Sequence, residues 1–244
     1  IVTNSGSLNL AGASFSGSPD ITVVPTTLDP YLLIRAINNT GFISSNHELK
    51  NVVLTNSSAG TIAFTNAAAG ATTNALVTGT FATNNGKIQT GTGSAKLYNI
   101  GLIAALSATS SIEPGGSGKG IASFSAATQT INGKLTLQVA ASATAGVDYD
   151  QIINSAAGGG FDISGATLDV TGLYTPAGAT TIDIVTASAV AGFEGTIAGS
   201  FASVIGLTTG WSVNYGVAGK VQLVYSGTTW NGSAWSNGRS EEHT

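Results

Sequence analysis

The chain has 244 residues and a net charge of −4, and only 8% of its residues carry a charged side chain. The 33 glycines make up about twice the share of about 7% that is usual in proteins, while cysteine and methionine do not occur. This composition excludes a highly charged disordered tail, a helical bundle rich in Lys and Glu, a nucleic-acid binder with a basic stripe, and any site built on thiolates.

Short apolar clusters separated by small polar residues follow one another along the chain. In order they lie at 21–24, 31–34, 52–54, 62–64, 75–77, 97–98, 121–124, 135–139, 152–153, 161–163, 168–170, 182–185, 211–213 and 221–224. Within 135–139 apolar and polar residues alternate, which predicts a strand with one buried face. Asn-Gly, Gly-Gly and Ser-Gly steps favour tight turns, and no long window keeps the 3.6-residue period of a helix. We therefore expect an all-β chain with very little helix.

Two all-β architectures fit clusters that recur about every 9 to 14 residues: an antiparallel sandwich, and a β-solenoid whose coils each supply two or three strands. The interior must be filled mainly by Val, Ile, Leu and Ala rather than by large aromatic residues, which favours the solenoid. The many Asn, Thr and Ser residues suit identical side chains stacked from coil to coil. At about 20 residues per coil, the chain would make ten to twelve coils.

A series of segments between residues 112 and 201 resembles a known family. They are Ile112–Ile121 (IEPGGSGKGI), Ala145–Ile152 (AGVDYDQI), Phe161–Val170 (FDISGATLDV), Ile182–Val185 (IDIV) and Gly192–Gly195 (GFEG). Their order is similar to the last coils of autotransporter passenger domains, and the Gly-x-x-Tyr-Asp-Gln-aliphatic element at 146–152 is the most specific piece. The resemblance implies a right-handed parallel β-helix.

The C-terminal part differs from the rest. Thr229–Gly238 (TWNGSAWSNG) resembles a junction element of large secreted surface proteins of the Bacteroidetes type, whereas Arg239–Thr244 resembles the translation of a sequencing adapter. We expect a segment of a longer protein, of metagenomic origin. Its expected parts are less regular solenoid coils at 1–110, autotransporter-like coils at 111–225, a junction to a further module at 226–238, and a non-native tail at 239–244.

Carboxylates are the first candidates for chemistry. Asp148 and Asp150 are two residues apart and on a strand would share a face, where their oxygens could bind calcium. Further carboxylates follow at Asp162, Asp169 and Asp183, and the nearest basic residues are Lys119, Lys134 and Lys220. The alternative reading is structural, because Asp side chains accept backbone N–H groups at turns. Apart from calcium at Asp148 and Asp150, no cofactor is expected.

Trp230 and Trp235 are the candidate ligand-binding residues, because exposed aromatic faces can stack on sugar rings. The alternative is that both pack down and close the end of the solenoid. His47 lies alone in a polar stretch and is expected to be an exposed loop residue. Gly115–Gly120 lacks the spacing of a phosphate-binding loop and precedes no predicted helix.

These observations predict a non-catalytic, structural or adhesive stalk segment of an extracellular bacterial surface protein. The expected partners are glycans or the surface of a host or neighbouring cell. Nucleic-acid binding, membrane insertion by this segment and self-association are not expected. The alternative is a module that binds or degrades polysaccharides on the same scaffold, as a lyase or glycoside hydrolase. A third reading is an interaction domain with an antiparallel sandwich fold.

Overall fold

The computed structural model describes part of the chain, and this part is all-β. Its backbone is described at residues 2–4, 7–9, 21–22, 36–39, 42–45, 49–50, 53–64, 73–77, 81–100, 106–124 and 127–227. Side chains are described at 55–63, 84–92, 106–124 and 127–227. No helix occurs among these residues, which confirms the prediction of an all-β chain.

All the described strands except β21 and β22 belong to four sheets, labelled A to D. Sheet A contains β1 (Val2–Asn4), β4 (Ala36–Asn39), β7 (Val53–Asn56) and β10 (Phe81–Asn84), and sheet D contains β15 (Thr128–Thr130), β18 (Gly160–Asp162) and β23 (Ile197–Ala198). Sheet B contains β2 (Ser7–Asn9), β5 (Phe42–Ser45), β8 (Thr61–Phe64), β11 (Lys87–Gln89), β13 (Ser111–Glu113), β16 (Lys134–Gln138), β19 (Thr167–Thr171) and β24 (Ser203–Ile205).

Sheet C has nine strands, in the spatial order β25-β26-β20-β17-β14-β12-β9-β6-β3. In chain order they are β3 (Ile21–Thr22), β6 (Leu49–Lys50), β9 (Thr73–Val77), β12 (Gly93–Ile100), β14 (Gly120–Phe124), β17 (Gln151–Asn154), β20 (Thr180–Thr186), β25 (Trp211–Asn214) and β26 (Lys220–Tyr225). A separate hairpin is formed by β21 (Ala189–Val190) and β22 (Phe193–Glu194).

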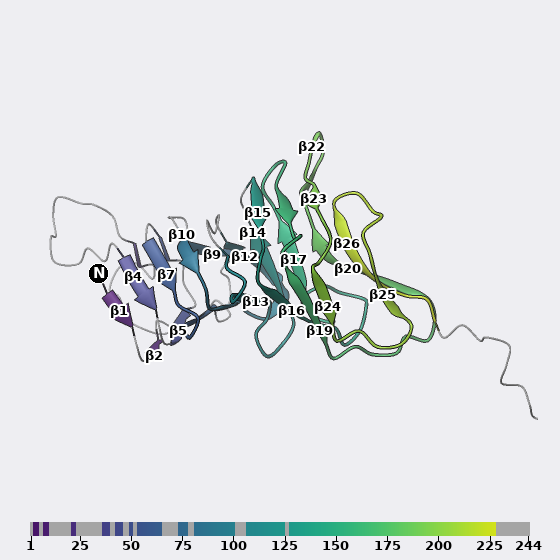
Figure 1. The fold of residues 1–244 in the computed structure, drawn as a ribbon, viewed down its shortest axis with the longest axis horizontal. Helices are drawn as coiled ribbons and strands as arrows, with labels where there is room; N and C mark the ends of the chain where they lie inside the picture. The colour runs from purple at the N-terminus through teal and green to yellow at the C-terminus, as the bar shows by residue number, and fades with distance from the viewer. Residues whose placement is uncertain are drawn as a thin grey trace, which may run out of the picture.

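The chain visits the sheets in a repeating order: a strand of A or D, then one of B, then one of C. Before β13 the first of these strands is replaced by a single bridge between Asn84 and Leu106. Neighbouring strands of sheets A, B and D pair in parallel, and Figure 1 shows the strands following one another along the long axis of the molecule. Parallel neighbours of this kind rule against the antiparallel sandwich, which requires successive hairpins.

One aliphatic position is in register through all eight strands of sheet B. It is occupied by Leu8, Ile43, Ile62, Ile88, Ile112, Leu135, Leu168 and Val204. We call this row the aliphatic ladder. Its members from Ile62 to Leu168 are almost completely buried, and they belong to one core cluster with residues of the other sheets, such as Phe124 and Phe161.

The ladder has fewer rungs than the ten to twelve coils expected from the sequence. The step from Ile43 to Ile62 is short, whereas the step from Leu168 to Val204, which contains the β21–β22 hairpin, is almost twice as long. Eight strands spaced by about 4.8 Å give sheet B a width of about 34 Å. The core also contains a fully buried pair of large aromatic residues, Phe124 and Phe161, which composition did not suggest.

Sheet A carries a row of asparagines in register, formed by Asn4, Asn39, Asn56 and Asn84. The side chains of Asn56 and Asn84 are completely buried, and Asn56 Nδ2 donates to Asn84 Oδ1 at 2.8 Å. Asn84 Nδ2 in turn donates to the carbonyl of Gly86 at 3.0 Å. A buried amide must find partners of this kind, because an unpaired one costs about 1–3 kcal/mol. The predicted stacking of like polar residues is confirmed here.

The corner between sheets A and B brings backbone segments into close contact at Gly86. The amide of Lys87 donates to Gly60 O at 2.9 Å, and the amide of Ser111 donates to Gly86 O at 3.0 Å. A Cβ atom at Gly86 would press on the carbonyl oxygens of Ser57 and Gly60, closer than real Cβ atoms approach. Only glycine therefore allows this corner to stack on the preceding one.

Sheet C ends differently from sheets B and D. Strand β26 pairs antiparallel with β20, and β25 pairs antiparallel with β26. Trp211 packs between Tyr174 and Tyr225, with ring centroids 5.9 and 5.3 Å away, and its indole N–H donates to Tyr174 O at 3.1 Å. The hairpin β25–β26 thus covers the end of sheet C with an aromatic cluster.

We predict that Gly86→Ala lowers the free energy of unfolding by about 1–3 kcal/mol, because the added methyl group forces two stacked corners apart. The matched control is Gly178→Ala, where a Cβ atom would meet no heavy atom within 4 Å. Its effect should stay within about 0.5 kcal/mol. Urea unfolding followed by circular dichroism measures both, and equal effects would contradict the close-approach explanation.

Candidate functional site

The carboxylate of Asp150 joins three separate segments of the chain. Its side chain is 0% exposed. Oδ1 accepts the amide N–H of Gly120 at 2.7 Å, at the start of β14, and Oδ2 accepts the amide N–H of Gln138 at 2.7 Å, at the end of β16. Asp150 itself lies immediately before β17. One side chain therefore fixes the relative positions of three strands.

The glycine-rich loop between β13 and β14 is held against this carboxylate. Gly115 and Gly116 have φ values of 71° and 59°, which L-residues with side chains rarely adopt. The amide of Gly115 donates to Thr90 Oγ1 at 3.1 Å, and Gln138 Nε2 donates to Gly116 O at 2.7 Å. A strand, not a helix, follows the loop. The prediction that no helix follows this run is confirmed.

Burial, with a smaller contribution from the negative charge of nearby Glu113, raises the pKa of Asp150 to about 7. The two backbone N–H groups of Gln138 and Gly120 and the positive charge of Lys119 act in the opposite direction. Removing a carboxylate from water is the largest of these effects, because the charged form loses its hydration. The group is therefore positioned to change its protonation state near neutral pH.

Asp148 and Asp150 are held by different backbone partners, and the strand on which their spacing would give a shared face is not regular here. Residues 146–148 form a turn rather than a strand, so the alternation of a strand does not apply. Asp148 Oδ2 accepts the amide N–H of Thr144 at 2.8 Å, and thus closes its own turn. Within the described residues there is no group of three or more His, Cys, Asp or Glu side chains placed to hold a metal ion. Calcium at Asp148 and Asp150 stays a prediction.

The remaining predicted carboxylates are engaged in turns and ion pairs. Asp162 Oδ1 accepts the amide and hydroxyl of Ser164 at 3.1 and 2.7 Å, and these bonds lower the pKa of Asp162. Asp169 pairs with Lys134 at 3.1 Å across sheet B. These contacts match the structural reading of the carboxylates, in which they stabilise turns and neighbouring strands.

Asp183 lies at the junction between the parallel and antiparallel parts of sheet C. It pairs with Lys220 and accepts a bond from Gln222 Nε2 at 2.6 Å, both on β26. Burial opposes ionisation, but these two partners hold the pKa of Asp183 below its usual value. The pair therefore fastens the hairpin β25–β26 onto β20.

A groove lies beside this junction, between the β22–β23 segment and the loop of the β25–β26 hairpin. It encloses about 330 Å³, and a second hollow of about 170 Å³ adjoins it. Both are lined by Glu194, Gly195, Ala218, Gly219 and Lys220. The sequence did not predict this groove. Glu194 and Gly195 on one wall are more than twenty residues away from Ala218, Gly219 and Lys220 on the other, and the two segments come together only through the antiparallel hairpin.

Several residues singled out from the sequence lie outside the described part of the chain. They are the candidate sugar-stacking residues Trp230 and Trp235, and the lone histidine His47. Their roles stay predictions.

Comparison with known protein families, curated proteins and solved structures finds no match to this chain. Within the described residues, no helix is long and apolar enough to cross a membrane.

We predict that Asp150 makes the protein less stable as the pH rises from about 4 to about 7. The folded state keeps the proton on Asp150 up to about pH 7, whereas the unfolded chain releases it near pH 3.8. The contribution of Asp150 to the free energy of unfolding is therefore fully present below the unfolded pKa of 3.8. It falls as the pH rises and is lost once the pH passes the folded pKa of about 7. The loss is at most about 4 kcal/mol, at about 1.4 kcal/mol per pH unit.

Urea unfolding at a series of pH values measures this slope. Asp150→Asn should lower stability at pH 4, because Nδ2 cannot accept a backbone N–H, and should remove the slope between pH 4 and 7. Asp148→Asn removes a carboxylate from the same loop and should leave the slope in place. A slope that persists in Asp150→Asn would assign the titration to another group.

Proposed function

We propose that the sheets close around their shared core as a right-handed parallel β-helix, and that this rod is a non-catalytic stalk segment of an extracellular bacterial surface protein. The observation that carries the proposal is the aliphatic ladder, which keeps one register through eight parallel strands. The repeated visiting order of the sheets is what one turn of a three-sided coil requires.

A rod of this kind acts through its length and its side surface. Each rung contacts only its neighbours, so stability adds up along the axis and the rod can hold two attached parts at a fixed distance. The resemblance of residues 112–201 to autotransporter passenger coils supports a position outside the cell. Glycans or the surface of a neighbouring cell are the partners that such a position favours, and calcium at Asp148 and Asp150 is the one cofactor considered.

The outer face of sheet B supports a structural rather than a catalytic role. Its charged side chains form ion pairs between adjacent strands, Lys87 with Glu113 at 2.8 Å and Lys134 with Asp169 at 3.1 Å. Gln89 Nε2 also donates to Glu113 Oε2 at 2.9 Å. Carboxylates held in this way link one rung to the next, whereas a glycosidase needs a pair of them free to act as acid and base.

The proposal is tested by removing one rung. Ile88 and Ile112 are register partners, so deleting Ile88–Ser111 joins Lys87 to Ile112 and keeps the ladder in phase. Because the chain has no cysteine, spin labels can be placed at Ala59→Cys and Ser200→Cys, which are exposed corner positions on either side of the deletion. We expect a cooperatively folded protein in which electron–electron resonance finds the labels closer by about 4.8 Å.

The control deletion, Ile88–Ile112, is one residue longer. It places Glu113 at the inward position of the ladder, because a shift of one residue exchanges the two faces of a strand. This variant should lose its cooperative unfolding transition. An unchanged label distance in the first variant, or equal behaviour of the two deletions, would refute a stacked rod. Release of reducing or unsaturated ends from polysaccharides by the purified chain would refute the non-catalytic role.

A further inference from the structure

The groove beside the β25–β26 hairpin has a strand edge on one wall. Thr196 O accepts the amide of Phe161 at 2.9 Å, and Ala198 O accepts the amide of Ile163 at 3.1 Å. These bonds direct Thr196 and Ala198 toward β18. Because successive residues of a strand direct their N–H and C=O groups to opposite sides, the N–H and C=O of Ile197 point away from β18. Ile197 lines the groove, and β23 is the outermost strand of sheet D.

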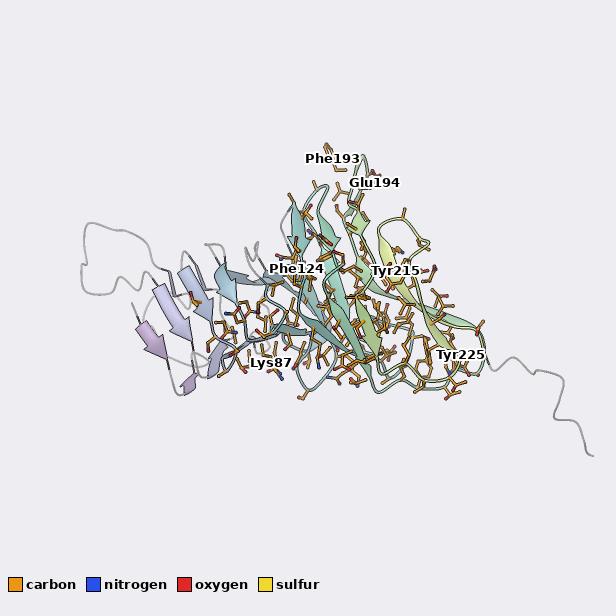
Figure 2. All side chains as sticks on the ribbon, viewed as in Figure 1. Lys87, Phe124, Phe193, Glu194, Tyr215 and Tyr225 are labelled. Carbon is orange, nitrogen blue, oxygen red and sulfur yellow. The ribbon has the colours of Figure 1, made fainter. Side chains whose placement is uncertain are left out.

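Exposed apolar side chains gather around the same groove. Of the six large apolar residues that are exposed in the described part, Tyr215 and Val217 line the groove, and Val190 and Phe193 lie on the hairpin β21–β22 that leads into it. Phe193 is 64% exposed, and Figure 2 shows it beside Glu194 at the outer end of this hairpin. Concentration of exposed apolar surface in one place is typical of a contact site.

The position of Tyr215 is fixed before any ligand arrives. Its hydroxyl oxygen accepts the amide N–H of Phe201 at 3.3 Å, and the two rings lie 6.2 Å apart. A ring held in this way loses little conformational freedom when a partner covers it.

The charges around the groove are not balanced. No charged residue occurs between Glu194 and Lys220, so β23 lacks the charged side chains that usually protect a strand edge. The ammonium group of Lys220 is committed to Asp183. The carboxylate of Glu194 is exposed and accepts backbone amide N–H groups, including that of Gly192 at 3.0 Å. The groove therefore presents one negative charge that no cation of the described residues neutralises.

We propose that this groove binds an extended peptide segment of a partner protein, which adds as a strand to the free edge of β23. Backbone bonds to Ile197 provide the register, apolar side chains at alternate positions contact Tyr215 and Val217, and a flanking cationic residue pairs with Glu194. Strand addition of this kind derives affinity from the main chain and selectivity from alternate side chains. The site goes beyond the stalk function and does not depend on it.

The first experiment titrates the full chain with a heptapeptide, blocked at both ends, in which Val and Thr alternate between two terminal lysines. Amide chemical shifts should change at Glu194–Gly199 and Val217–Val221. The same peptide N-methylated at alternate residues cannot form the strand bonds, and should bind at least about tenfold more weakly. A version with terminal glutamates should also bind more weakly than the lysine peptide.

Variants of the protein separate the three contacts. Ile197→Pro removes the N–H on the free side of β23 only, and should weaken binding while the amide signals of β18 remain in place. Glu194→Lys should reverse the preference between the lysine and glutamate peptides. Val217→Ser should weaken binding, whereas Val147→Ser, at a residue that is 56% exposed and does not line the groove, should not.

Three outcomes would overturn the proposal: no shift changes with any peptide, changes confined to other surfaces, or affinities unaffected by N-methylation. Binding of neutral oligosaccharides in the groove with no peptide binding would assign the site to a different class of ligand. None of these outcomes bears on the rung-deletion experiment, so the stalk function is judged separately.

Discussion

The structure depends on one constraint, which is that parallel strands of sheet B stay in register over eight rungs. Each strand has an aliphatic side chain at the ladder position, and a slip by one residue would turn that side chain to solvent and bring a residue such as Lys87 or Glu113 inside. The corners follow from this register, since the amide of one corner binds the carbonyl of the one before. The asparagine row and the ion pairs across sheet B are consequences of the same stacking.

Much of the local structure could be predicted from the sequence, because alternation of apolar and polar residues is a local property. The cluster at 135–139 corresponds closely to β16, and small polar residues mark the turns. The number of residues between successive ladder positions could not be predicted. A connection such as 172–179 can be long or short without changing the register of the strand that follows it. Strand direction could not be predicted either. The apolar clusters at 211–213 and 221–224 have the same pattern as the others, yet they form the antiparallel hairpin β25–β26.

The candidate sites show the same limit. Asp148 and Asp150 were found from their spacing, but the spacing predicts a shared face only on a regular strand, and residues 146–148 form a turn. The burial of Asp150 depends on Gly120 and Gln138, which are distant in sequence. The groove depends on Glu194 and Tyr215, which carry no common pattern. For these residues the three-dimensional contacts, rather than the residue types, decide the chemistry.

The reversed direction of β26 has a consequence for how such a chain can evolve. A stack of parallel rungs has no inherent length, and its last rung offers the same edge to the next segment as every rung before it. In sheet C that edge is occupied by a strand running the opposite way. Tandem duplication of a rung upstream of Thr180 would therefore lengthen the stack while the hairpin that covers the end of sheet C stays the same, so that the number of rungs and the covering hairpin can change independently.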